Sequence, residues 1–313
     1  MASSGSIDFT RTRNQIIYGA LRKCGVGAEG ETPTSEQVDN AAADLNGLVK
    51  VWQKEGVHLW TLQECVLLLD TSSTYYDLGA SGDRYVTADS LVSTTITADA
   101  ALGASTLTLA SVTGISTTYA IGLVQDDDTI HWTTVNGAPA GLVVTLTAVT
   151  TAAATSGNKV YVYSALAARP LGIEQARIQT DSTSETEMAI LSSDDYFSIA
   201  NKSATGVPNQ FYYRPSLTNG RMYIWPVSET VDYKINVTAR RPIEDFDASA
   251  DTPDLPQEWV QPLIWCLAEE IKMEYGVDPI TSAEIKQKSI EWYERVSNFD
   301  IDESDIVINI DLG

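Results

Sequence analysis

The feature of this sequence that most constrains its fold is an abrupt change of composition between residues 79 and 165. This segment contains no glutamate and only two basic residues, Arg84 and Lys159, and Thr, Ala, Ser, Val and Gly dominate it. Short runs of alternating polar and apolar residues recur at 93–97, 105–109, 120–124, 129–134, 142–146 and 160–163. Turn signals such as Asn136-Gly137 separate these runs. Short strands at near-regular spacing predict a small all-β module, a barrel or a sandwich, inserted at 79–165.

Both ends of the chain show helical periodicity instead. Between residues 38 and 52, apolar side chains recur at spacings of three and four, behind the capping-box pair Thr34 and Gln37. The pair Thr281 and Glu284 repeats the capping-box pattern before the last helix. The expected helices cover about 10–25, 34–55, 256–276 and 281–298.

Between the helices and the inserted module, runs with a period of two indicate further strands. They lie at 66–69, 74–78, 173–179, 187–191, 210–213, 221–225 and 233–239. We therefore expect the α+β class: a helical bundle formed by both chain ends, with a β-rich middle and an inserted small all-β barrel or sandwich module. The expected domains are a core made of 1–78 and 166–313 and the module at 79–165.

The net charge is the strongest global property of the chain. It carries 42 acidic and 20 basic residues, which gives a formal net charge of −22. Such a chain repels phosphate, so it is a poor candidate for holding DNA through the release of counterions. The plainer interpretation is that an acidic surface keeps an abundant protein soluble.

Composition also suggests where the protein works. No apolar run approaches the ~18–20 residues of a membrane-spanning helix, and the amino terminus is polar, without the apolar core of a signal peptide. We therefore expect no membrane partner and a protein that stays in the reducing cytoplasm in which it is made. Cys24, Cys65 and Cys266 lie far apart without a CxxC spacing, which favours buried, reduced thiols over a disulfide framework.

No set of residues has the spacing of a catalytic, cofactor or metal site. The two histidines, His58 and His131, have no Cys, His or carboxylate at ligand spacing, and the nucleophile-elbow and phosphate-loop motifs are absent. The acidic run 126–128 could attract calcium, but it lacks the spaced ligand pattern and is better interpreted as a hairpin tip. We expect no enzymatic activity, no cofactor and no metal.

Four tyrosines lie on neighbouring predicted strands: Tyr212, Tyr213, Tyr223 and Tyr233. They could form a platform for a sugar. Cross-strand aromatic pairs in a half-buried sheet are the commoner outcome.

The carboxy-terminal tail is the candidate site for docking a partner. Residues 299–313 carry five acids and no base. The tail also holds a strongly β-prone apolar run: Ile306, Val307, Ile308, Ile310 and Leu312. A frayed end is the default for a terminus, but an apolar run of this kind is a liability if left bare. We therefore expect the tail to add as a strand to another surface, in its own assembly or in a partner.

A series of short motifs follows a fixed order along the chain. The motifs are Leu45-Asn46, Trp52, Leu59-Trp60, 75–78, 190–197, 206–208, 223–226, Arg241-Pro242, 254–256, Trp259 and 267–270. Each is weak alone, but their order resembles the head-to-tail adaptor family of short-tailed bacteriophages over most of 8–78 and 166–298. The segment 79–165 departs from the minimal pattern of that family and resembles a small β insertion of some phage structural proteins.

The resemblance implies a virion structural protein, a subunit of a homo-oligomeric, dodecameric ring at the head–tail junction, assembled in the host bacterial cytoplasm. Its helical end would bind the portal protein and its β end the tail nozzle or fibre proteins. DNA would pass through the ring without specific binding. The alternative is a carbohydrate-binding, adhesin-like or tail-fibre-associated phage structural protein, which the threonine-rich insert and the tyrosines motivate.

Overall fold

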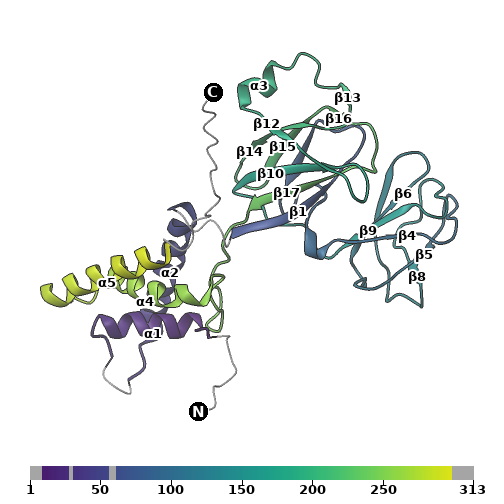
Figure 1. Ribbon diagram of the computed structural model, residues 1–313. Helices are drawn as coiled ribbons and strands as arrows, with labels where there is room; N and C mark the ends of the chain where they lie inside the picture. Colours follow the sequence, from purple (N-terminus) through teal and green to yellow (C-terminus); the bar gives the residue numbers. More distant parts are fainter. Residues whose placement is uncertain (1–8, 28–30, 56–60, 298–313) are drawn as a thin grey trace, which may run out of the picture. The chain divides into compact units, whose positions relative to one another are not determined.

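The computed structural model describes residues 9–27, 31–55 and 61–297 (Figure 1). The chain divides into two compact units, one formed by 1–61 together with 243–313 and the other by 62–242. Among the described residues, the first unit holds the longer helices and the second holds all the strands and one short helix. We call them the helical unit and the β unit.

The described α-helices of the helical unit are α1 (Arg13–Lys23), α2 (Ser35–Glu55), α4 (Val260–Ile271) and α5 (Pro279–Ser297), and the 3-10 turn η3 (Gln257–Trp259) precedes α4. A reciprocal capping box starts α1, because the Thr12 side chain accepts the backbone N–H of Gln15 and the Gln15 side chain accepts that of Thr12. Thr34 and Gln37 form the same pair of hydrogen bonds at the start of α2, so the predicted capping box there is confirmed.

The start of α5 differs from the expectation. The carboxylate of Asp278 accepts the backbone N–H groups of Ile280 and Thr281, and Pro279 occupies the first helical position. An acidic cap followed by proline satisfies the free N–H groups at a helix start. The helix therefore begins before Thr281, and the predicted capping box at that residue is wrong.

An apolar core surrounds α4. Leu263 and Leu267 of α4 are fully buried in one cluster with Ile17 of α1 and Leu45 of α2. Burying one such side chain contributes ~1.5–3 kcal/mol to folding. Helix α4 contacts α1, α2 and α5, whereas α5 packs mainly on α4.

The main part of the β unit consists of two sheets that share one core. The antiparallel five-stranded sheet has the order β11-β10-β17-β1-β3, and the four-stranded sheet has the order β12-β14-β15-β2. Their strands are β1 (Leu62–Leu68), β2 (Tyr75–Leu78), β3 (Tyr85–Thr87), β10 (Gly172–Gln179), β11 (Glu185–Glu187), β12 (Ala189–Ile190), β14 (Gln210–Arg214), β15 (Gly220–Trp225) and β17 (Lys234–Arg240). Alternate side chains from both sheets enter the core, for example Ile235 and Val237 from β17 and Met222 and Ile224 from β15.

Two smaller elements complete this part. Helix α3 (Ser193–Ser198) begins where the Ser192 side chain accepts the backbone N–H of Asp195. The short strands β13 (Thr205–Gly206) and β16 (Val227–Ser228) pair in parallel. These elements follow or precede strands of the four-stranded sheet in the chain.

Six strands of the β unit form the module. They are β4 (Val92–Thr95), β5 (Thr106–Thr108), β6 (Ala120–Val124), β7 (Ile130–Thr134), β8 (Val143–Thr145) and β9 (Lys159–Tyr163), preceded by the 3-10 turn η2 (Ala88–Ser90). They pair as the sheets β4-β9-β6-β7 and β5-β8. Bridges between Ile96 and Leu109 and between Val135 and Leu146 join the outer edges of both sheets, so the strands run in a closed circle. Each run predicted in the sequence overlaps one of these strands, and β4 and β9 begin one residue before their runs.

An apolar cluster attaches the module to the five-stranded sheet. It contains Val124, Tyr161 and Tyr163 from β6 and β9, Val66, Leu68 and Val86 from β1 and β3, and Val231 from the loop before β17. Arg84 adds a hydrogen bond to the hydroxyl of Tyr163 (2.9 Å) and lies 4.7 Å over the ring of Trp132. The carboxylate of Asp128 accepts the hydroxyl of Thr230 (3.0 Å). Apolar burial and specific polar contacts therefore fix the module to the sheet.

The structure contradicts the expected fold class. The chain is α+β overall, but its described residues are mostly β-sheet in five small sheets with only about 27% helix, and their helices do not form the expected bundle at both chain ends. The helices pack around α4, and α5 packs mainly on α4, so the helical unit does not close into a regular bundle. The spacing of apolar residues indicates each helix by itself, but it does not reveal which helices pack against one another.

Along the chain, the boundaries between the compact units fall at 61/62 and 242/243. The domain boundaries expected from the sequence were 78/79 and 165/166. Independent folding of 79–165 stays a prediction. Across the residues that the structure describes, no helix combines the length and apolar character needed to cross a membrane.

Candidate functional site

The tail predicted to dock a partner lies outside the described residues, with Ile306, Val307, Ile308, Ile310 and Leu312. Its docking stays a prediction. His58 also lies outside the described residues.

His131 is buried in strand β7 of the module. Its Nε2 lies 3.4 Å from the carbonyl oxygen of Ala148, and its Nδ1 lies 3.4 Å from the hydroxyl of Thr151. Both ring nitrogens therefore have partners within the module. Among the described residues, no group of three or more His, Cys, Asp or Glu side chains could hold a metal ion.

The acidic run 126–128 lies at the turn between β6 and β7, and each carboxylate there has hydrogen-bond donors. Asp126 accepts from the backbone N–H of Thr155 and from the side chain of Asn158, and these bonds lower the pKa of Asp126. Asp127 accepts the N–H of Thr129 within the turn. With the Asp128 contact to the sheet described above, the run works as a hairpin tip that fixes loops.

The three cysteines are free thiols. Cys24 and Cys65 are buried and Cys266 is half-buried. Burial raises the pKa of Cys24 and Cys65 to about 11 and that of Cys266 to about 12. Because the thiolate is the reactive form, these side chains are poor nucleophiles at neutral pH.

The outer face of the four-stranded sheet gathers aromatic side chains. Tyr212 of β14, Tyr223 of β15 and Tyr75 of β2 are register partners, so they form one row across three strands. The rings of Tyr212 and Tyr223 are 5.7 Å apart and nearly parallel, at 14°, and those of Tyr75 and Tyr223 are 5.9 Å apart. From α3, Tyr196 and Phe197 come within 4.9 and 5.8 Å of Tyr223. We call these five residues the aromatic cluster.

The next row on the same face is charged. Arg214, Arg221 and Asp77 are register partners on the same three strands. Arg221 donates from Nε and Nη2 to the two carboxylate oxygens of Asp77 (2.7 and 3.0 Å), which raises the pKa of Arg221. Leu217, in the turn between β14 and β15, is 99% exposed. This end of the sheet thus has Arg214 and the Arg221–Asp77 ion pair near an exposed leucine.

The ring positions bear on whether the predicted tyrosines form a platform for a sugar or cross-strand aromatic pairs. Tyr223 has the rings of Tyr212, Tyr75 and Tyr196 around it, so protein covers surface that a sugar would stack on. Tyr213 faces the other way and donates its hydroxyl to the carbonyl oxygen of Pro170 (2.6 Å). Tyr233 donates to a carboxylate oxygen of Glu229. Of the four tyrosines predicted as a platform, Tyr212 and Tyr223 are the two whose rings contact each other, as a cross-strand pair. Tyr75 was not among the tyrosines predicted as a platform, although Tyr75 and Asp77 show the same two-residue spacing as Arg221 and Tyr223.

Charge is distributed unequally between the two units. The sequence of the helical unit has 25 acidic and 10 basic residues, and that of the β unit has 17 and 10. Most of the net charge of −22 therefore belongs to the helical unit. Several acids cluster in the segment that leads into α4: Glu244, Asp245, Asp247, Asp251, Asp254 and Glu258.

Comparison with known proteins shows no family, because no protein-family model matches this chain and no curated protein matches it.

Proposed function

We propose that this chain is a virion structural protein, a subunit of the head-to-tail adaptor ring of a short-tailed bacteriophage. Twelve copies close a ring under the portal, and the ring connects the portal to tail nozzle or fibre proteins. DNA passes through without specific binding. The protein works at the head–tail junction after assembly in the host bacterial cytoplasm.

The observation that carries the proposal is how the motifs that resemble the adaptor family pack. In the helical unit, the rings of Trp52 and Trp259 lie 5.3 Å apart. In the β unit, Tyr196 from motif 190–197 packs on Tyr223 from motif 223–226. Motifs far apart in the sequence thus hold one another in place, as expected of residues that define a common fold.

The charge distribution also supports a conduit for DNA. Acidic residues in a channel wall leave phosphates without cations to bind, so the genome can slide. The helical unit supplies most of that charge. The outer face of the β unit presents Arg214, next to the Arg221–Asp77 ion pair, near the exposed Leu217. A ring closes through unlike surfaces of successive copies, and an arginine-bearing face is complementary to an acidic neighbour.

Negative-stain imaging of the full chain mixed with its portal tests the proposal. We expect twelvefold rings bound under the portal and a solution mass far above the 33.9 kDa subunit. A chain that stays monomeric both alone and with the portal contradicts it. The solution mass also separates the proposal from the alternative, since a carbohydrate-binding, adhesin-like module would keep the mass of a small species and form no ring.

A matched pair of variants locates the ring contact. Leu217 and Leu102 are both exposed leucines in turns of the β unit, 99% and 70% exposed. We expect Leu217→Glu to lower ring yield, because it puts an acid beside Arg214 where an acidic neighbour must dock. Leu102→Glu should leave the yield unchanged. Equal yields for both variants contradict a contact at this end of the sheet.

A further inference from the structure

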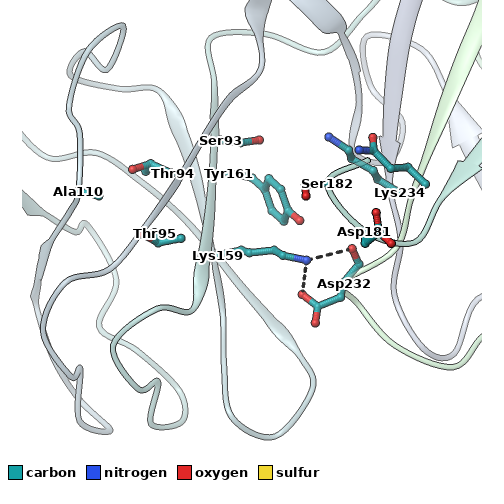
Figure 2. A pocket seen from close by; sticks show the side chains of 11 residues that line it. Ser93, Thr94, Thr95, Ala110, Lys159, Tyr161, Asp181, Ser182, Asp232 and Lys234 are labelled. Carbon is teal, nitrogen blue, oxygen red and sulfur yellow. Dashed lines mark hydrogen bonds and ion pairs between the residues drawn. The ribbon is translucent and has the colours of Figure 1, made fainter. Parts of the chain in front are cut away.

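A cleft lies inside the β unit, between the module and the five-stranded sheet (Figure 2). Its volume is about 340 Å³, at the small end of the range of ~300–1,000 Å³ for ligand sites. Strands β4 and β9 of the module form one wall, and the end of β10, the turn after it and the start of β17 form the other. Six of the lining side chains carry a charge or a hydroxyl group and come from both walls of the cleft: Lys159, Tyr161, Asp181, Ser182, Asp232 and Lys234.

An ion pair holds the two walls together at one side of the cleft. Lys159 Nζ lies 2.8 Å from a carboxylate oxygen of Asp232 and 3.4 Å from the carbonyl oxygen of the same residue, as the dashed lines in Figure 2 mark. This lysine is therefore already neutralised. Its role is to position the walls.

Lys234 is the second lysine that lines the cleft. It is half-buried, and its Nζ makes no hydrogen bond or ion pair with any residue that the structure describes. Burial lowers the pKa of Lys234, and the charge of Lys159 lowers it further, against the opposing effect of Glu185. A half-buried positive charge that makes no hydrogen bond or ion pair is stabilised when an anion binds beside it.

The other polar groups of the cleft are donors and acceptors suited to hydroxyl groups. Burial raises the pKa of Tyr161 to about 12, so its hydroxyl stays protonated and can donate. Ser182 adds a hydroxyl that can donate or accept. The carboxylates of Asp181 and Asp232 accept, and each keeps capacity beyond its present bonds because a carboxylate has about four lone-pair sites. Sugars present hydroxyls that both donate and accept.

We propose that this cleft binds a carboxylated sugar, the size of one uronic acid residue. The carboxylate lies at Lys234, and the ring hydroxyls lie between Tyr161, Asp181 and Asp232. The chain is acidic overall, but salt screens exposed charges beyond about 8 Å at physiological ionic strength. The charges that act on the ligand are therefore those of the cleft, where Asp232 is paired with Lys159 and Lys234 has no hydrogen-bonded carboxylate. The site is complete within one subunit and does not depend on the formation of a ring.

Titration of the full chain with glucuronate, followed by ligand-observed NMR, tests this assignment. We expect saturable binding in the millimolar range, where single sugars commonly bind small clefts. Glucose lacks the carboxylate and acetate lacks the hydroxyls, so both should bind at least about tenfold more weakly. Absence of glucuronate binding overturns the proposal. If acetate binds as tightly as glucuronate, the cleft is a plain anion site and the proposal is overturned. If glucose binds as tightly as glucuronate, the carboxylate is not recognised and the proposal is overturned as well.

Two lysine variants locate the ligand. Lys234→Gln should weaken glucuronate binding roughly 10- to 100-fold, as expected for losing a hydrogen bond to a charged group, with unchanged glucose binding. Lys54→Gln, at an exposed lysine of α2, should change neither. Thermal unfolding checks that both variants are folded. If Lys234→Gln is folded and binds glucuronate as the parent chain does, the ligand is not in this cleft. Either result is obtained whether or not the chain forms rings.

Discussion

Trp52 of α2 and Trp259, directly before α4, hold their rings 5.3 Å apart at an angle of 57°. Tyr293 of α5 completes the contact, with its ring 5.4 Å from that of Trp52. Helices from the two ends of the sequence thus meet at one aromatic contact. Trp259 is 2% exposed, so its ring belongs to the core.

Replacing this ring should destabilise the helical unit. We expect Trp259→Ala to lower the free energy of unfolding by about 3–5 kcal/mol, because it removes a buried ring and leaves a cavity. Urea unfolding followed by helical circular dichroism measures the loss. Trp292→Ala is the control, since Trp292 is only half-buried with Arg295 over its ring. Equal losses in the two variants contradict a special role for the Trp52–Trp259 contact.

Deleting the module at 79–165 and closing the gap with a short Gly/Ser bridge should leave the helical unit folded. The two units have separate cores, so the helical circular-dichroism signal should persist. The deletion removes strand β3 and the apolar cover of Val66 and Leu68, so the remaining sheet should bind a hydrophobic dye. A matched deletion of 91–164, which keeps β3, should bind less dye. Loss of the helical signal contradicts the prediction.

Stability should fall when the pH drops from about 4 to about 2. Asp181 accepts the N–H groups of Thr183 and Ser184, and these bonds lower its pKa from 3.8 to about 2. A carboxyl group whose pKa is lowered by folding stabilises the fold above its unfolded pKa and loses that contribution as the pH falls through the folded value. Thermal unfolding across this range should show a shallower slope for Asp181→Asn than for the control Glu187→Gln. An identical slope contradicts the assignment.

The chain should bind duplex DNA negligibly, even at low ionic strength, where electrostatic attraction is least screened. The net charge of −22 opposes phosphate, and most of it belongs to the helical unit. A gel shift at micromolar protein in low salt measures this. A shifted band contradicts a channel through which DNA slides freely.

Removing the tail after Asn298 should leave a folded subunit that binds the portal poorly. Burying one of its apolar side chains contributes ~1.5–3 kcal/mol, so docking several outweighs the entropy lost when a short strand is ordered. Circular dichroism measures folding, and co-sedimentation with the portal measures docking. Tailed particles that form at normal yield with the truncated chain mean that the tail does not dock.

Some of this structure could be predicted from the sequence because the partners lie a few residues apart. Thr34 and Gln37 satisfy each other's free backbone groups, so the start of α2 is a local property. The strands of the module alternate with a period of two, and glycines at the intervening turns hold a positive φ, as at Gly137 and Gly157. Such signals need no knowledge of the rest of the chain. The cap of α1 is local too, because Thr12 and Gln15 lie three residues apart.

What the sequence alone did not determine depends on pairing between distant segments. The row of Tyr75, Tyr212 and Tyr223 exists because three strands pair in one register, and a slip of one residue would turn a tyrosine to the other face. Lys159 and Lys234 line one cleft only because β9 and β17 lie across it from each other. The fold class was wrong for the same reason. Helical periodicity indicates α5, but only tertiary packing decided that α5 rests mainly on α4 and that sheets dominate the chain.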